Sequence, residues 1–100
     1  MNIARLLKTA INTFGKDHQL GKIVEESSEF GAAYFHYCDQ REGSLDELRS
    51  ELADLMITTW QGRLILGAKE VDDLIDEKLA KLESQIRAEQ ESRKAVQNAT

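Results

Sequence analysis

The chain contains no proline in 100 residues, and this absence constrains its fold more than any other feature. Proline is a strong helix breaker and turn former, so glycine is left as the main punctuation of the chain. Of the 6 glycines, Gly15, Gly43 and Gly67 separate long segments whose apolar residues recur at helical spacing. We therefore expect an all-α protein, and both turn-rich β architectures and disordered low-complexity chains fit the composition poorly.

The spacing of apolar residues predicts four helices. The first lies near residues 2–14, the second begins at about residue 18 or 19 and ends near 40, and the third covers 44–66. The fourth carries an apolar stripe between residues 71 and 86. Beyond Arg87 there are almost no apolar residues, so residues 88–100 should fray or continue as a solvated helix. At this length we expect one domain, residues 1–100, folded as a four-helix bundle.

The third predicted helix differs from an ordinary amphipathic helix. Ser44 and Glu47 are spaced as a capping box, which predicts that the helix begins there. A helical wheel gives this helix two apolar faces, one with Leu52 and one with Trp60, and a narrow polar strip between them. We expect such a helix to be buried on both sides, by its own chain and by a partner subunit. The polar strip consists of Glu51, Asp54 and Thr58.

Charge and cysteine content narrow the possible functions. The formal net charge is −5 and no basic stripe is visible, which disfavours binding to nucleic acid or to an anionic membrane. No apolar run reaches the length of about 20 residues that a membrane span needs, and the first residues do not resemble a signal peptide. Cys38 is the only cysteine, so an intrachain disulfide and a multi-thiolate metal site are excluded. We expect a cytoplasmic protein.

Acidic residues occur on helix faces where a purely structural helix would not need them. Glu26 and Glu29 share one face of the second helix, close to its apolar stripe, and Glu51 and Asp54 lie on the polar strip of the third. Both pairs have the spacing i, i+3, so on neighbouring antiparallel helices four carboxylates would point to one place. Buried carboxylates need a proton, a cationic partner or a metal ion, and the strip contains no lysine or arginine. An all-oxygen ligand set favours Mg²⁺ or Mn²⁺.

These acids also carry a resemblance to a known family. The segment Glu25-Glu26-Ser27-Ser28-Glu29 is followed after 21 residues by Glu51-Leu52-Ala53-Asp54. This arrangement resembles the EExxE…ExxD signature of the MazG-like, all-α nucleoside triphosphate pyrophosphatases. The resemblance covers roughly residues 15–87. It implies a small helical bundle that forms dimers or tetramers through its long helices.

The resemblance also implies an activity and roles for individual residues. The expected reaction is the Mg²⁺-dependent hydrolysis of a nucleoside triphosphate to a monophosphate and pyrophosphate, which would remove noncanonical or excess deoxynucleotides; Mn²⁺ is a possible substitute. By position, the metal ligands are Glu26, Glu29, Glu51 and Asp54. Glu25 is then the general base or a group that holds a metal-bound water. Lys78 and Lys81, on the fourth helix, are the expected contacts to the triphosphate. Thr58 departs from the aromatic residue that many relatives have one turn after the last acid.

Two other functions remain open from the sequence. The chain could be a noncatalytic helical module whose acidic face binds a basic partner, in which case metal dependence would be absent. It could also be an enzyme similar to the phosphoribosyl-ATP pyrophosphatases, which share the fold and the acidic motifs. The sequence does not choose the base or the sugar of a nucleotide substrate.

Overall fold

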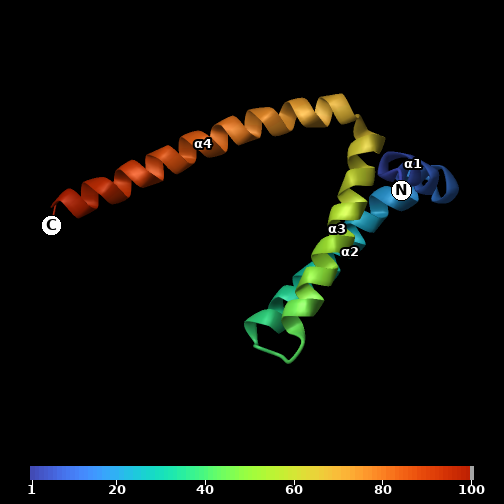
Figure 1. Cartoon of the computed structure of the whole chain (residues 1–100), viewed down its shortest axis with the longest axis horizontal. Coiled ribbons are helices and arrows are strands. Elements are labelled where there is room, and N and C mark those ends of the chain that lie inside the picture. The colour runs from blue at the N-terminus through green and yellow to red at the C-terminus, as the bar shows by residue number, and fades with distance from the viewer. Residues whose placement is uncertain (100) are drawn as a thin grey trace. The chain divides into compact units, whose positions relative to one another are not determined.

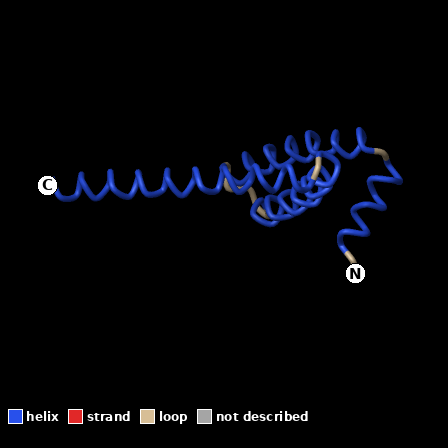
Figure 2. The backbone as a smooth tube through the Cα atoms, turned by 90° about the horizontal axis from the view of Figure 1, so that it is seen from above, coloured by secondary structure: helices blue, strands red, loops and turns tan. Residues whose placement is uncertain are grey.

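The computed structural model describes residues 1–99, and these residues form four α-helices and no strand (Figures 1 and 2). The helices are α1 (Ile3–Phe14), α2 (Lys16–Cys38), α3 (Ser44–Leu66) and α4 (Ala68–Ala99). The prediction of an all-α protein is therefore confirmed. The chain divides into two compact units, the first formed by α1, α2 and α3 and the second by α4.

Short polar and glycine residues set the ends of α1. The side chain of Asn2 caps its N-terminus, with Oδ1 accepting a hydrogen bond of 3.0 Å from the Arg5 N–H. At the other end Gly15 has φ +96°, a conformation that glycine adopts without steric cost. The next helix begins directly after this glycine, at Lys16, two residues before the predicted start. A single residue in a glycine-only conformation therefore replaces the longer connection that we expected.

The connection from α2 to α3 closes a helical hairpin. Gln40 and Gly43 both have positive φ values, +58° and +74°, which turn the chain between Cys38 and Ser44. The predicted start of α3 is confirmed, but the predicted capping box is wrong. The Ser44 side chain makes no capping hydrogen bond and is buried. The Glu47 carboxylate reaches across the hairpin to His36, 2.9 Å from Nδ1, instead of back to its own helix.

The two helices of the hairpin lie side by side (Figure 1) and meet along a regular line of residues. On each helix one series of buried and half-buried positions alternates at intervals of four and three residues. This is the heptad spacing of helices that pack at a shallow angle. We call this line the seam. Its residues are Gln19, Ile23, Glu26, Phe30 and Ala33 on α2, and Ser44, Leu48, Glu51, Leu55, Thr58 and Gly62 on α3.

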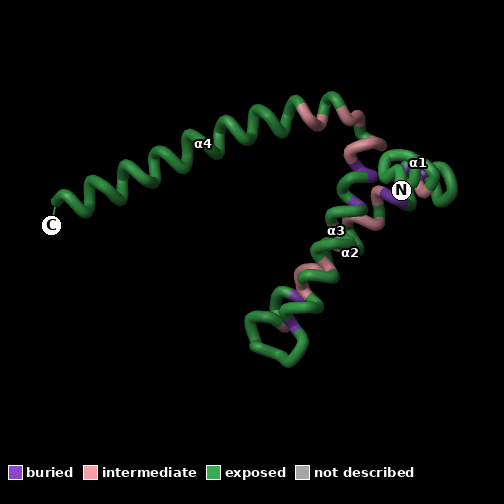
Figure 3. Tube along the Cα trace, in the orientation of Figure 1, coloured by how far each residue is buried: buried purple, intermediate pink, exposed green. Residues whose placement is uncertain are grey.

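The seam contains fewer large apolar side chains than the hydrophobic core of an ordinary helical hairpin. Among residues 1–99 only Leu7, Ile11 and Ala33 are buried apolar residues, and no large side chain is completely buried (Figure 3). Our expectation that the chain itself would bury one apolar face of α3 is largely wrong. Leu52 and Trp60, one on each face, remain 44% and 43% exposed. The side of α3 that meets α2 combines Glu51 and Thr58 of the polar strip with the half-buried apolar residues Leu48 and Leu55.

The second unit is the single helix α4, and none of its residues is buried. The segment after Arg87, for which we expected fraying or a solvated helix, is helical as far as Ala99. Ion pairs at i, i+4 accompany this extension, Arg87 with Glu83 and Arg93 with Glu89. None of the helices in the described part of the chain combines the length and hydropathy needed to cross a bilayer.

Candidate metal centre

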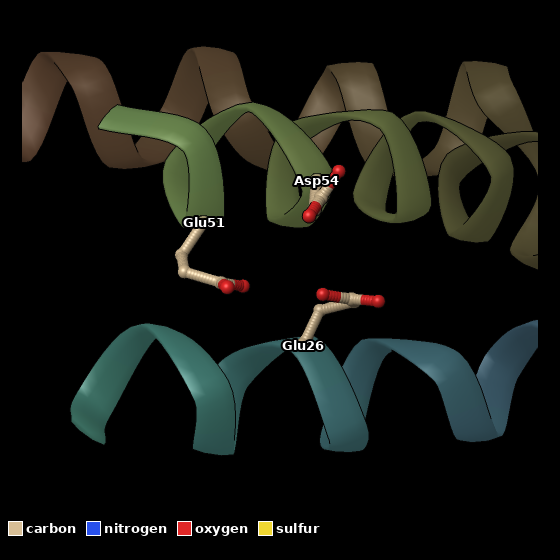
Figure 4. Close-up of side chains that lie close together, drawn as sticks. All are labelled: Glu26, Glu51 and Asp54. Carbon is tan, nitrogen blue, oxygen red and sulfur yellow. The ribbon is translucent and has the colours of Figure 1, made fainter. Parts of the chain in front are cut away.

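Three acidic side chains meet near the middle of the hairpin (Figure 4). Glu26 projects from α2, while Glu51 and Asp54 project from α3 towards it. One carboxylate oxygen of each residue lies within 4.8 Å of the others. Glu26 and Glu51 are seam residues, so they occupy positions that apolar residues fill in most heptad-packed helices. The hairpin therefore places two carboxylates where two helices press together.

Both seam carboxylates are poorly solvated. The Oε2 atoms of Glu26 and Glu51 are buried and have no hydrogen-bond partner among the described residues. Burial is the main cause that raises the pKa of Glu26, followed by the charge of Glu29 and a hydrogen bond to it, and then by Asp54 and Glu51. The pKa of Glu51 is also raised, again first by burial and then by Glu29 and Asp54. Each group is thus held in an environment that disfavours its charged form.

The fourth predicted ligand belongs to the same electrostatic cluster. Glu29 is exposed and lies outside the close set of three. Its charge nevertheless raises the pKa of both Glu26 and Glu51, so it lies near enough to act on each of them. We call Glu26, Glu29, Glu51 and Asp54 the acid cluster. The structure brings together three of the four residues that the sequence suggested as ligands, Glu26, Glu51 and Asp54, while Glu29 acts on two of them through its charge.

The remaining predicted site residues lie outside this cluster. Glu25 is exposed and forms an ion pair of 3.5 Å with Lys22, one turn earlier on α2. Lys78 and Lys81 are exposed residues of α4, in the second unit. The catalytic role of Glu25 and the substrate contacts of the two lysines remain predictions.

The acid cluster has the properties that a divalent cation requires. Its donors are carboxylate oxygens, which suit hard cations such as Mg²⁺ and Mn²⁺. Two of these oxygens are buried without a partner, and a bound cation would supply the missing interaction. An ion with ligands at about 2.1 Å spans donors up to about 4.2 Å apart, and the three donor oxygens lie within 4.8 Å of one another, so at most small side-chain movements would bring them to a common ion. The residues present therefore fit a metal ion.

A polar contact that the sequence analysis did not predict lies on the same hairpin. Gln19 Nε2 donates a hydrogen bond of 2.7 Å to Gln61 Oε1, and the two side chains are 6% and 5% exposed. The available signal was the spacing: Gln19 precedes Glu26 by seven residues, and Gln61 follows Asp54 by seven. Residues separated by seven on packed helices lie on the same side.

Comparison with known proteins does not identify the chain: no family model, curated protein or solved structure matches it.

Proposed function

We propose that this protein is a Mg²⁺-dependent nucleoside triphosphate pyrophosphohydrolase of the cytoplasm. The observation that carries the proposal is the acid cluster, in which two carboxylate oxygens are buried without a partner. Such an arrangement is unfavourable in the absence of a proton or a cation. The similarity of the EExxE…ExxD spacing to the MazG-like signature supports the choice of a nucleotide as substrate.

In the proposed reaction, Glu26, Glu29, Glu51 and Asp54 hold the metal. When bound, Mg²⁺ neutralises charge on the triphosphate and makes a coordinated water more acidic. Water attacks the α phosphorus, the bond from that phosphorus to the oxygen bridging the α and β phosphates breaks, and pyrophosphate leaves with this oxygen. Glu25 accepts the proton of the attacking water, which requires its carboxylate to leave Lys22. Lys78 and Lys81 bind phosphate oxygens.

Detection of pyrophosphate tests this proposal. The purified protein is incubated with a panel of ribo- and deoxynucleoside triphosphates and with phosphoribosyl-ATP, with Mg²⁺, with Mn²⁺ or with a chelator. We expect metal-dependent release of pyrophosphate, which the double variant Glu51→Ala, Asp54→Ala lowers at least about a thousandfold. Glu42→Ala, in the exposed loop between α2 and α3, is the matched control and should retain activity.

Two outcomes would contradict the proposal. One is no pyrophosphate from any substrate of the panel with either metal. The other is full activity of the double variant, which would mean that the acid cluster is not the site. Protein that is inactive and binds no metal would instead support the alternative of a noncatalytic module that binds a basic partner.

We also propose that the active protein is a homodimer or a homotetramer. α3 exposes apolar residues on both sides of the seam, among them Leu52, Met56, Ile57 and Trp60, each 43–45% exposed. Trp60 also lines an open apolar groove of about 370 Å³ between α1 and α3. A helix that is apolar around most of its circumference is usually buried on all sides. A second copy of the chain supplies such a cover.

A further inference from the structure

The Gln19–Gln61 pair forms a buried connection between α2 and α3 beyond the acid cluster, on the side away from the α2–α3 loop. The hydrogen bond of 2.7 Å joins residues 42 positions apart in sequence. Gln19 Oε1 also lies 2.7 Å from His18 Nδ1, so the amide of Gln19 is held at both of its ends. A buried side-chain hydrogen bond has a defined direction and length, whereas apolar contacts tolerate sliding and rotation.

The pair lies in the same register as the acid cluster. Gln19 and Glu26 are separated by seven residues on α2, and Asp54 and Gln61 by seven residues on α3. Two helical turns therefore separate the amide pair from the acid pair on each helix, about 10 Å along the axis. If Gln19 and Gln61 face each other, Glu26 must face Asp54.

The Gln19–Gln61 hydrogen bond constrains a part of the hairpin that the α2–α3 loop does not reach. At the closed end, the α2–α3 loop and the His36–Glu47 contact hold the helices together. The acid cluster lies further along, and the Gln19–Gln61 hydrogen bond lies beyond it. Thr58 does not bridge the helices, since its hydroxyl donates to carbonyls of α3 itself.

Close packing near the pair gives the same constraint a steric component. A Cβ atom at Gly62 would lie 2.6 Å from Ile23 Cδ1, so the helices approach closely one residue after Gln61. A side chain at position 62 would have to displace the end of the Ile23 side chain, and this contact does not by itself choose which residues face each other. The directed hydrogen bond supplies that choice.

We infer that Gln19 and Gln61 are a positioning pair, whose hydrogen bond holds α2 and α3 in the register that gathers the acid cluster. The effect that we expect on metal binding rests on the proposed function. The effect that we expect on the register of α2 and α3 does not, so the register can be measured independently.

The test measures register directly in the full chain. Nitroxide labels are placed at the exposed positions Ser28 and Ser50 as cysteines, in a Cys38→Ser background. Labelled chains are refolded with an excess of unlabelled chain. The distance measured by pulsed electron paramagnetic resonance is then the distance between the two nitroxides of one chain. The parent should give one narrow distance distribution. Gln19→Met combined with Gln61→Met keeps the side-chain lengths and removes the hydrogen bond; its distribution should broaden or divide.

Two matched variants test whether a broader distribution results from loss of the Gln19–Gln61 hydrogen bond or from loss of any polar group between α2 and α3. Thr58→Val removes a polar group from the seam without breaking a contact between helices, and its distribution should stay narrow. Gln61→Glu keeps an acceptor for Gln19 Nε2 and should also stay narrow. Circular dichroism checks folding; if the methionine pair does not fold, Gln19→Leu with Gln61→Leu replaces it.

The second readout is the binding of Mn²⁺ alone, which is measured from the electron paramagnetic resonance signal of the free ion. The methionine pair should bind Mn²⁺ at least about tenfold more weakly than the parent, while Gln61→Glu retains the affinity. An unchanged narrow distribution in the methionine pair, or equal broadening in Thr58→Val, would overturn the inference. Absence of Mn²⁺ binding by the parent would refute the metal centre and leave the inference to be decided by the distance measurement.

Discussion

The seam between α2 and α3 and the outer faces of α3 show opposite relations between polarity and burial. In the seam, Glu26, Glu51 and Gln19 are buried or half-buried. On the outer faces, large apolar side chains such as Ile57 and Trp60 are almost half exposed. A stable isolated hairpin would have the reverse pattern.

From this contrast we infer that the hairpin is incomplete as a folding unit in two separate ways. Its seam lacks a positive charge to balance the acid cluster, and its outer faces lack an apolar cover. The proposed metal ion supplies the positive charge, and the proposed second copy of the chain supplies the apolar cover. If this interpretation is correct, each deficiency can be removed or worsened without affecting the other.

The largest effect is expected on the outer face. Ile57→Asp puts a charge on an apolar surface of α3, and we expect it to weaken self-association about a hundredfold or more. Sedimentation velocity at micromolar concentration measures the change. Val96→Asp, on a more exposed apolar residue near the end of α4, should leave association unchanged. A parent protein that sediments as a monomer would contradict the proposed dimer or tetramer.

The next effect concerns the charge of the seam. Mg²⁺ at about a hundred times its dissociation constant should stabilise the protein by about 2.7 kcal/mol, which raises Tm by about 10 °C or more in a chain of this size. Glu26→Gln combined with Glu51→Gln should abolish this shift and raise Tm in the absence of metal, because two buried charges are lost. Differential scanning calorimetry with Mg²⁺ and with a chelator measures both. A Mg²⁺ shift that survives in the double variant would place the metal elsewhere.

A smaller effect follows from the raised pKa values of Glu26 and Glu51. A carboxyl whose pKa is raised on folding binds its proton more tightly in the native state, so its favourable contribution is complete below the ordinary pKa of 4.5 and is lost as pH rises through the folded value. Without metal, the free energy of unfolding should therefore fall with rising pH, relative to that of the Glu26→Gln, Glu51→Gln variant. Urea unfolding of both proteins between about pH 4 and about pH 8 measures this difference. A constant difference would contradict the prediction.

The smallest effect is expected at the end of α4. Removal of the residues after Arg87 deletes exposed helix, including the Arg93–Glu89 ion pair. Because exposed pairs at i, i+4 contribute only about 0.3–0.5 kcal/mol, the free energy of unfolding should change by less than about 1 kcal/mol. The Mg²⁺-induced rise in Tm should stay the same. A lost Mg²⁺ response would show that this segment contributes to the metal site.

The elements of the fold were predictable because their signals are local. Gly15, Gly43 and Gly67 mark the ends of the helices, and the apolar spacing identifies each helix between them. The gathering of Glu26, Glu51 and Asp54 was also predictable, since two i, i+3 pairs on consecutive antiparallel helices can meet. Both depend on the geometry of single helices and on their order along the chain.

The errors arose where contacts across the hairpin compete with local ones. Ser44 and Glu47 have the spacing of a capping box, but the seam buries Ser44 and His36 attracts Glu47. The helical wheel identified the polar strip of α3 without showing that Glu51 and Thr58 of this strip, together with Leu48 and Leu55, face α2. The Gln19–Gln61 contact depends on the register of two helices, which the properties of neither helix alone reveal.

The heptad spacing of the seam also limits how the gene can vary in length. One residue inserted between Asp54 and Gln61 would rotate everything after it by about 100°, turning Gln61 away from Gln19. Natural variants of the chain should therefore tolerate insertions and deletions between Asp39 and Gly43 or after Arg87, and should keep the number of residues from Gln19 to Glu26 and from Asp54 to Gln61 constant.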